Sequence, residues 1–76
     1  MNFSKVILKQ GKDKSIRRRH PWVFSGAVFG VSKELQDGEV VDVVDDRNNH
    51  LGTGFFSDRG SIVVRLLTFG EEVFDE

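Results

Sequence analysis

Residues 39–56 read EVVDVVDDRNNHLGTGFF, and this stretch decides the fold class of the 76-residue chain. A valine-rich run is followed by a polar loop, and residues 50–56 then return with apolar and small side chains. The pair Asn48-Asn49 tolerates the left-handed backbone of a tight turn, so the stretch predicts a β-hairpin. Gly52 and Gly54 share one face of the return strand, which indicates a bend or a close approach by a neighbour.

Short apolar runs bounded by turn residues lie on both sides of this hairpin. The sequence predicts about five strands, at residues 5–9, 27–31, 39–44, 50–56 and 62–67. Asp13 is the expected cap of one short helix, which should stop near Arg19 because Pro21 disfavours helical geometry at the preceding residue. The expected fold is therefore mainly β, a small barrel or sandwich with one short helix after the first strand.

The segment Trp22-Val23-Phe24 is apolar throughout and is expected to enter the core. Large aromatic side chains are mostly buried, so a core position is predicted for Trp22, against the helix. The alternative is that Trp22 is an exposed platform on which a base stacks.

Charge is distributed unevenly along the chain. Residues 1–33 carry eight Lys and Arg against one acid, whereas residues 34–76 carry three Arg against eleven acids. This polarisation indicates an anionic partner on one face. The sequence has no cysteine, which fits a reducing compartment. It also has neither an apolar run of about 18 residues nor a signal-peptide pattern, so no membrane association and a cytoplasmic location are expected.

Residues 12–22 read KDKSIRRRHPW and combine five cations with a histidine and an aromatic side chain. Cations neutralise phosphates, while guanidinium and aromatic planes stack on unpaired bases. No local acid is expected to pair with the three adjacent arginines, which favours a nucleic-acid surface over a solvated helix face. His20 is expected to shape the turn before Pro21 or to donate to a phosphate. The predicted RNA-binding residues are Lys12, Lys14, Arg17, Arg18, Arg19, His20, Ser25 and Gly26.

Other groupings predict no chemistry. Asp42, Asp45 and Asp46 lack the spacing of a calcium loop and are expected at a solvated hairpin edge. The Gly52-Thr53-Gly54 run lacks the third glycine and the helix of a dinucleotide site. No nucleophile, acid and base converge, so we expect no catalytic residue, no metal site and no enzyme activity in this chain alone.

Four blocks carry a resemblance to a known family. They read KDKSIRRRHPWVFSGAV at 12–28, GEVVDVVD at 38–45, LGTGFF at 51–56 and SIVVR at 61–65. Together they resemble the N-terminal PUA domain of bacterial ribosomal RNA large-subunit methyltransferases, which methylate cytosine at C5 with S-adenosylmethionine. The resemblance covers nearly the whole chain, and its most specific part is His20-Pro21-Trp22.

The resemblance implies a PUA-like pseudobarrel over residues 1–69, with residues 70–76 as a tail or the start of a linker. It implies that the domain holds ribosomal RNA for a methyltransferase domain of the same polypeptide. The cofactor loop and catalytic cysteine would lie in that other domain, so no cofactor is expected here. The alternative is a structural or protein-interaction domain that packs on its catalytic neighbour through the acidic second half.

Overall fold

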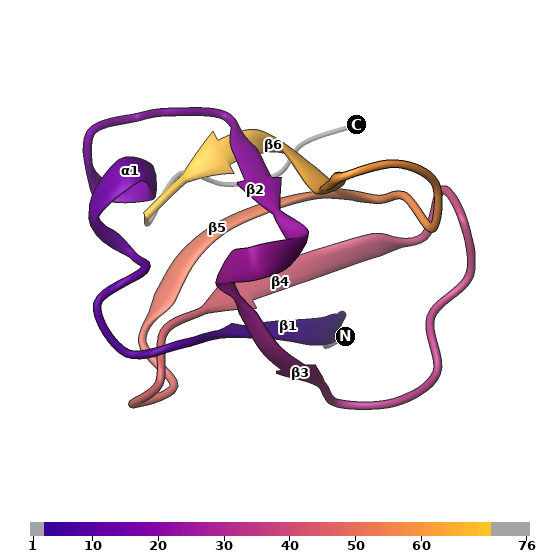
Figure 1. The fold of residues 1–76 in the computed structure, drawn as a ribbon, viewed down its shortest axis with the longest axis horizontal. Coiled ribbons are helices and arrows are strands. Elements are labelled where there is room, and N and C mark those ends of the chain that lie inside the picture. Colours follow the sequence, from indigo (N-terminus) through magenta and orange to yellow (C-terminus); the bar gives the residue numbers. More distant parts are fainter. Residues whose placement is uncertain (1–2, 71–76) are drawn as a thin grey trace.

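The computed structural model describes residues 3–70 as six strands, one short α-helix and one 3-10 turn (Figure 1). In chain order the elements are β1 (Ser4–Leu8), α1 (Lys14–Arg17), β2 (Trp22–Phe24), the 3-10 turn η1 (Ser25–Ala27), β3 (Val28–Val31), β4 (Val40–Val44), β5 (His50–Phe56) and β6 (Ile62–Phe69). The prediction of a mainly β chain with a short helix after the first strand is confirmed. The number of strands is six rather than about five.

The strand that the sequence did not predict is β2. It pairs antiparallel with β6, with Trp22 opposite Arg65 and Val23 opposite Val64. Three consecutive apolar residues show no alternation, so their pattern does not distinguish a strand from a buried loop. The pairing with β6 therefore fixes the conformation of this segment.

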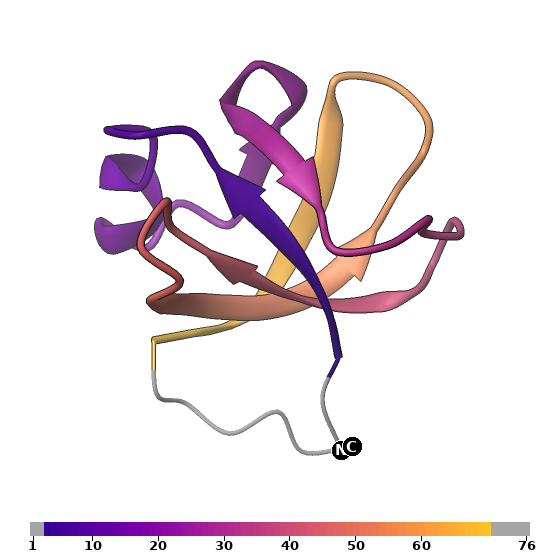
Figure 2. The same cartoon turned by 90° about the horizontal axis from the view of Figure 1, so that it is seen from below.

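The six strands form one sheet in the order β2-β6-β5-β4-β1-β3. β1 runs parallel to β4, and the other neighbours are antiparallel. The two end strands, β2 and β3, are consecutive in the chain and are joined by η1. The sheet therefore curls around its own interior until the 3-10 turn links its two ends, as the second view shows (Figure 2).

The interior of the curled sheet is aliphatic. Its buried residues come from β1, α1, β2, β4, β5 and β6, and they are Val6, Leu8, Ile16, Val23, Val41, Val43, Leu51, Val64 and Leu66. Strand side chains alternate between the two faces of a sheet, so β1, β4 and β6 each contribute two residues spaced two apart. The helix contributes Ile16, which fastens α1 to the end of the core.

Two glycines of β5 allow the backbone of the paired strand β6 to approach closely. A Cβ atom at Gly54 would lie 2.2 Å from the Arg65 carbonyl oxygen, and one at Gly52 would lie 2.4 Å from that of Thr68. Real Cβ atoms do not approach backbone so closely, because the atoms would overlap. The predicted close approach at these two positions is confirmed, and the register of the β5–β6 pair shifts between Thr53 and Gly54.

The helix α1 ends at Arg17, two residues before the predicted end, in a Schellman turn. The Arg19 N–H donates to Ile16 O at 2.8 Å, and the His20 N–H donates to Ser15 O at 2.9 Å. Arg19 holds the left-handed backbone of this motif, with φ of 64°. At the other end of α1, the prediction that Asp13 caps the helix is wrong, because its side chain makes no capping hydrogen bond.

Candidate functional site

All eight predicted RNA-binding residues are exposed. Five of them line two hollows on either side of α1, and Arg18, His20 and Ser25 line neither. The first lies between α1 and β2, and Lys12, Lys14 and Gly26 line it. The second lies between α1 and the end of β6, where Arg17 and Arg19 line it. The segment is therefore not one continuous basic face.

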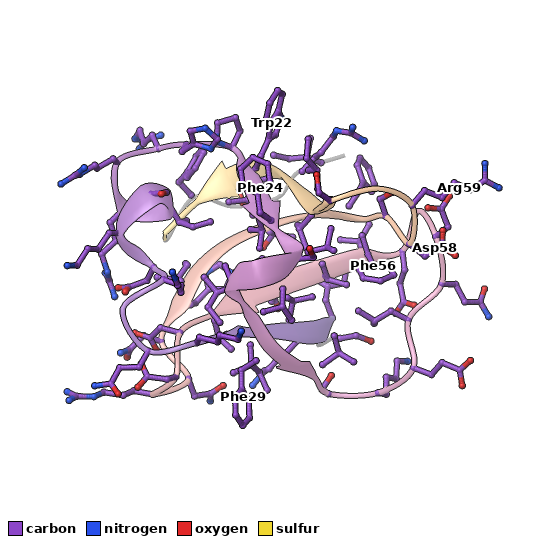
Figure 3. The ribbon with its side chains drawn as sticks, in the orientation of Figure 1. Trp22, Phe24, Phe29, Phe56, Asp58 and Arg59 are labelled. Carbon is purple, nitrogen blue, oxygen red and sulfur yellow. The ribbon has the colours of Figure 1, made fainter. Side chains whose placement is uncertain are left out.

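An exposed aromatic cluster borders the first hollow. The Trp22 ring centre lies 5.9 Å from that of His20 and 6.5 Å from that of Phe24, and both pairs meet nearly at right angles. Trp22 and Phe24 are each 44% exposed, and the two side chains project together from β2 (Figure 3). The prediction that Trp22 belongs to the core is wrong. In a strand only alternate residues enter the core, and in β2 that residue is Val23.

The first hollow has a volume of about 480 Å³. Its lining residues come from the end of β1, the following loop, α1, β2 and η1, and they are Leu8, Gly11, Lys12, Lys14, Ser15, Ile16, Trp22, Val23, Phe24, Gly26 and Ala27. The set contains two lysines and no acidic residue. It therefore combines an aromatic wall with positive charge.

Arg17 has acidic partners, which corrects the prediction that no local acid pairs with the arginine run. Its guanidinium forms ion pairs with Asp13, four residues earlier, and with Asp45 at 3.3 Å. The hydrogen bond from Arg17 lowers the pKa of Asp13 and raises the pKa of Arg17 itself. Arg17 therefore fastens α1 to the β4–β5 loop in addition to facing solvent.

Asp45 is buried, with 6% of its surface exposed, so the prediction of a solvated hairpin edge is wrong for this residue. Its carboxylate accepts from the Asn49 side-chain amide at 3.0 Å and from the Asn49 and Arg47 backbone N–H groups at 2.8 and 2.9 Å. These hydrogen bonds, led by those from Asn49, lower the pKa of Asp45, and the charge of Arg17 adds to the effect. Asp45 therefore holds the hairpin loop together.

The remaining predicted residues lie at the helix exit and in η1. Arg18 is the exposed C-cap residue of α1, and the Arg19 guanidinium lies 5.3 Å from the Phe69 ring centre. His20 accepts a 3.3 Å hydrogen bond from the Trp22 N–H through Nδ1, so it helps to shape the turn. Gly26 is exposed, and a Cβ atom there would meet nothing within 4 Å.

A second polar cluster ties the hairpin to the end of β6. The Thr53 hydroxyl donates to Asp42 Oδ1 at 2.7 Å, and His50 Nε2 lies 3.1 Å from the same oxygen. His50 Nδ1 lies 2.7 Å from the Gly70 carbonyl oxygen, so this nitrogen donates. Within residues 3–70, no three His, Asp or Glu side chains are placed to hold a metal ion. In that same part of the chain, no helix is long and apolar enough to cross a membrane.

Comparisons with known proteins agree with this architecture. The ribosomal RNA large subunit methyltransferase I of Alteromonas mediterranea is 44% identical over 69 residues, and that of Shewanella amazonensis is 46% identical over 68. The Salmonella arizonae protein of the same name is 41% identical over 68 residues. These alignments cover 90–91% of this chain but 17% of each relative, so the chain spans about a sixth of their length. Residues 6–69 match the family described as PUA-like domain, and the chain therefore belongs to the PUA-like domain family.

Proposed function

We propose that this domain binds ribosomal RNA and positions it for an S-adenosylmethionine-dependent methyltransferase domain of the same polypeptide. The observation that carries the proposal is an exposed set of unpaired cations at α1. Within residues 3–70, Lys12, Lys14 and Arg18 form no ion pair. The names of the relatives supply the class of RNA and the reaction.

The phosphate contacts are assigned to the cations around α1. Lys12 and Lys14 face the first hollow, and Arg18 lies at the helix exit between the two hollows. Arg17 and Arg19 line the second hollow and are exposed, so both are assigned a phosphate contact in addition to their contacts within the domain. His20 belongs to the aromatic cluster, Ser25 and Gly26 follow Phe24 in η1, and all three residues are exposed to RNA.

The domain boundary and the chemistry belong to the same proposal. Residues 1–69 form the RNA-binding domain, and residues 70–76 begin the connection to the methyltransferase domain. Residues 71–76 lie outside the described residues. Cytosine C5 is the proposed target atom, on the strength of the sequence resemblance.

The described residues do not fit S-adenosylmethionine. The loop between β1 and α1 contains one glycine, Gly11, and α1 has four residues. A nucleotide loop of the familiar kind needs several glycines and a full helix after the strand. We therefore assign the cofactor to the proposed catalytic domain and derive no methyl-transfer step from these residues.

A second candidate function is a structural or protein-interaction domain that packs on its catalytic neighbour. The observation that favours it is the exposure of two apolar side chains on the end strand β3, where Phe29 is 77% exposed and Val31 is 43% exposed. Phe29 projects from the side of the molecule opposite Trp22 (Figure 3). The two functions can coexist, because they use different surfaces.

The test is the salt dependence of RNA affinity, measured by fluorescence anisotropy with a labelled ribosomal RNA fragment. The double variant Lys12→Gln/Lys14→Gln should bind several-fold more weakly. Its log–log slope against salt should fall by about 0.7–0.9 for each lost phosphate contact.

The matched control is Arg59→Gln. The Arg59 side chain is 91% exposed and lies in the β5–β6 loop, away from α1 (Figure 3). This variant should retain the wild-type affinity and slope. The lysine variant removes two positive charges and the control removes one. An equal loss of affinity per removed charge would mean that charge anywhere on the surface suffices, and would overturn the assigned site.

A further inference from the structure

We infer that the hollow between α1 and β2 receives one unpaired nucleotide of the RNA, with its base stacked on Trp22 and its phosphate near Lys12 and Lys14. The inference rests on the RNA binding proposed above and names the part of the RNA that this surface takes. It follows from the shape of the hollow, the faces of its aromatic rings and its charge.

The size of the hollow suits a small planar group. Its volume of about 480 Å³ lies within the range of about 300–1,000 Å³ that is typical of small-molecule sites. The buried side chains of Leu8, Ile16 and Val23 form its floor, and Trp22 and Phe24 form one wall. An apolar floor beside an aromatic wall favours a ring that can be removed from water.

The rings leave room for a stacked base. His20 and Phe24 meet the Trp22 ring at interplanar angles of 81° and 80°, so neither lies flat against the indole. With 44% of the residue exposed, indole surface remains for a parallel ring to cover. Offset stacking of an aromatic ring on a base is favourable and tolerates any base.

The charge of the hollow selects a nucleotide over an apolar protein segment. Lys12 and Lys14 line it, and no acidic residue does. Arg65, opposite Trp22 on β6, is also exposed and extends the positive charge beyond the aromatic wall. An apolar peptide would gain nothing from these cations, whereas a nucleotide uses the aromatic wall and the cations together.

The nucleotide has to be unpaired. A base in an A-form helix is stacked on both faces and cannot meet an indole, whereas loop and bulge bases can be turned outward. The hollow therefore predicts a preference for single-stranded RNA over a duplex of the same composition. Such a preference would not follow from phosphate contacts alone.

The experiment uses the intrinsic fluorescence of the chain, which has one tryptophan and no tyrosine. Emission from Trp22 is recorded while a single-stranded oligoribonucleotide, or a duplex of the same composition, is added. The single strand should quench the emission and the duplex should not. Trp22→Leu should lower the single-strand affinity roughly tenfold or more, as loss of a stacked base does, whereas Trp22→Phe should retain most of it.

The matched control is Phe29→Leu, which alters an exposed aromatic residue on the opposite side of the molecule. It should leave the single-strand affinity unchanged. Thermal melting shows whether each variant is folded, and the quenching of wild-type emission decides the question even if Trp22→Leu does not fold.

The outcomes separate this inference from the proposed function. If the wild-type chain binds RNA with a steep salt dependence but Trp22 emission is unchanged and Trp22→Leu binds normally, the nucleotide site is wrong and RNA binding stands. If the wild-type chain binds no RNA by anisotropy, both are wrong. The second candidate function, a structural or protein-interaction domain, then takes the place of RNA binding.

Discussion

The guanidinium carbon of Arg19 lies 5.3 Å from the centre of the Phe69 ring, while the Arg19 backbone is left-handed with φ of 64°. Helices commonly end with glycine at this position, because an L side chain is strained there. The strain is offset by a cation–π contact between the helix exit and the last residue of β6. Arg19 thus connects α1 to the strand that leads toward residue 70.

Arg19→Ala should destabilise the domain by about 0.5–1 kcal/mol, because it removes the cation–π contact and keeps the strained backbone. Arg19→Gly removes the same contact but relieves strain worth about 1 kcal/mol. We therefore expect Arg19→Gly to be about 1 kcal/mol more stable than Arg19→Ala, as measured by urea unfolding. Equal stability of the two variants would show that the strain does not exceed the unfolded-state entropy that glycine adds, about 0.4–1 kcal/mol.

Gly54→Ala should be strongly destabilising. The new Cβ would lie 2.2 Å from the Arg65 carbonyl oxygen and 2.7 Å from the Leu66 Cα, which are backbone atoms of the paired strand. Overpacking of this kind costs about 1–3 kcal/mol or more, and about 1 kcal/mol shifts the melting temperature of a small domain by about 4–8 °C. Differential scanning calorimetry measures the loss.

The control for this prediction is Gly30→Ala in β3. A Cβ atom there would meet nothing within 4 Å, and Gly30 is not among the glycines with positive φ. It should shift the melting temperature by only a few degrees. If Gly54→Ala melts at the temperature of Gly30→Ala, the close approach of the β6 backbone does not restrict the size of the side chain at residue 54.

Much of the fold could be predicted, because its long strands carry patterns that need no tertiary information. The hairpin of β4 and β5 has valine-rich and glycine-containing strands around a polar loop. Of the two asparagines expected to tolerate a left-handed backbone, Asn48 adopts it, with φ of 67°. The strand β2 could not be predicted, because three apolar residues have no visible period. Its conformation depends on pairing with β6, which is 41 residues away in sequence at the Val23–Val64 pair.

The sequence could predict which cations of the candidate site are exposed, but not the side chains with which they form ion pairs. The five cations are exposed, as the sequence indicated, although only Lys14 and Arg17 lie within α1. The pairing of Arg17 with Asp45 joins residues 28 apart, and the burial of Asp45 depends on how the hairpin loop folds. Trp22 is exposed because Val23 is the residue of β2 that faces inward. Hydrophobicity alone would place the larger Trp22 side chain in the core, so nothing in the sequence indicated this orientation.

Stability should fall in acid, and Asp45 should account for part of the loss. Its hydrogen bonds with Asn49 and Arg47 lower its pKa in the folded state, while the unfolded value is about 3.9. The folded state therefore gains stability from the ionised carboxylate above about pH 4 and loses it as pH falls through the lower folded pKa. The lowered pKa values of Asp13 and Glu39 act in the same direction.

Melting temperatures measured between pH 7 and pH 3 check this dependence on acid. Asp45→Asn should lower the melting temperature at pH 7 and reduce its fall toward pH 3, because an amide cannot gain this stabilisation by ionising. Asp46→Asn is the control, since Asp46 is the exposed neighbour in the same loop. An Asp45→Asn profile parallel to that of the wild type would rule out Asp45 as a source of acid sensitivity.

The two adjacent arginines of the helix exit should separate stability from RNA binding. Arg17→Gln removes the ion pairs with Asp13 and Asp45 and leaves the buried Asp45 carboxylate with one fewer donor. We expect its melting temperature to fall. Arg18 is exposed and makes no ion pair within residues 3–70, so Arg18→Gln should melt like the wild type.

The RNA measurements should show the complementary effect at Arg18. If Arg18 contacts a phosphate, Arg18→Gln should weaken binding and reduce the log–log salt slope by about 0.7–0.9 without loss of stability. A double-mutant cycle between Arg17→Gln and Asp45→Asn isolates the structural part of Arg17, because the two changes should be non-additive in melting temperature. Additive losses would show that Arg17 does not stabilise the loop through Asp45. A normal salt slope in Arg18→Gln would remove Arg18 from the RNA surface and leave the lysines of the first hollow to carry it.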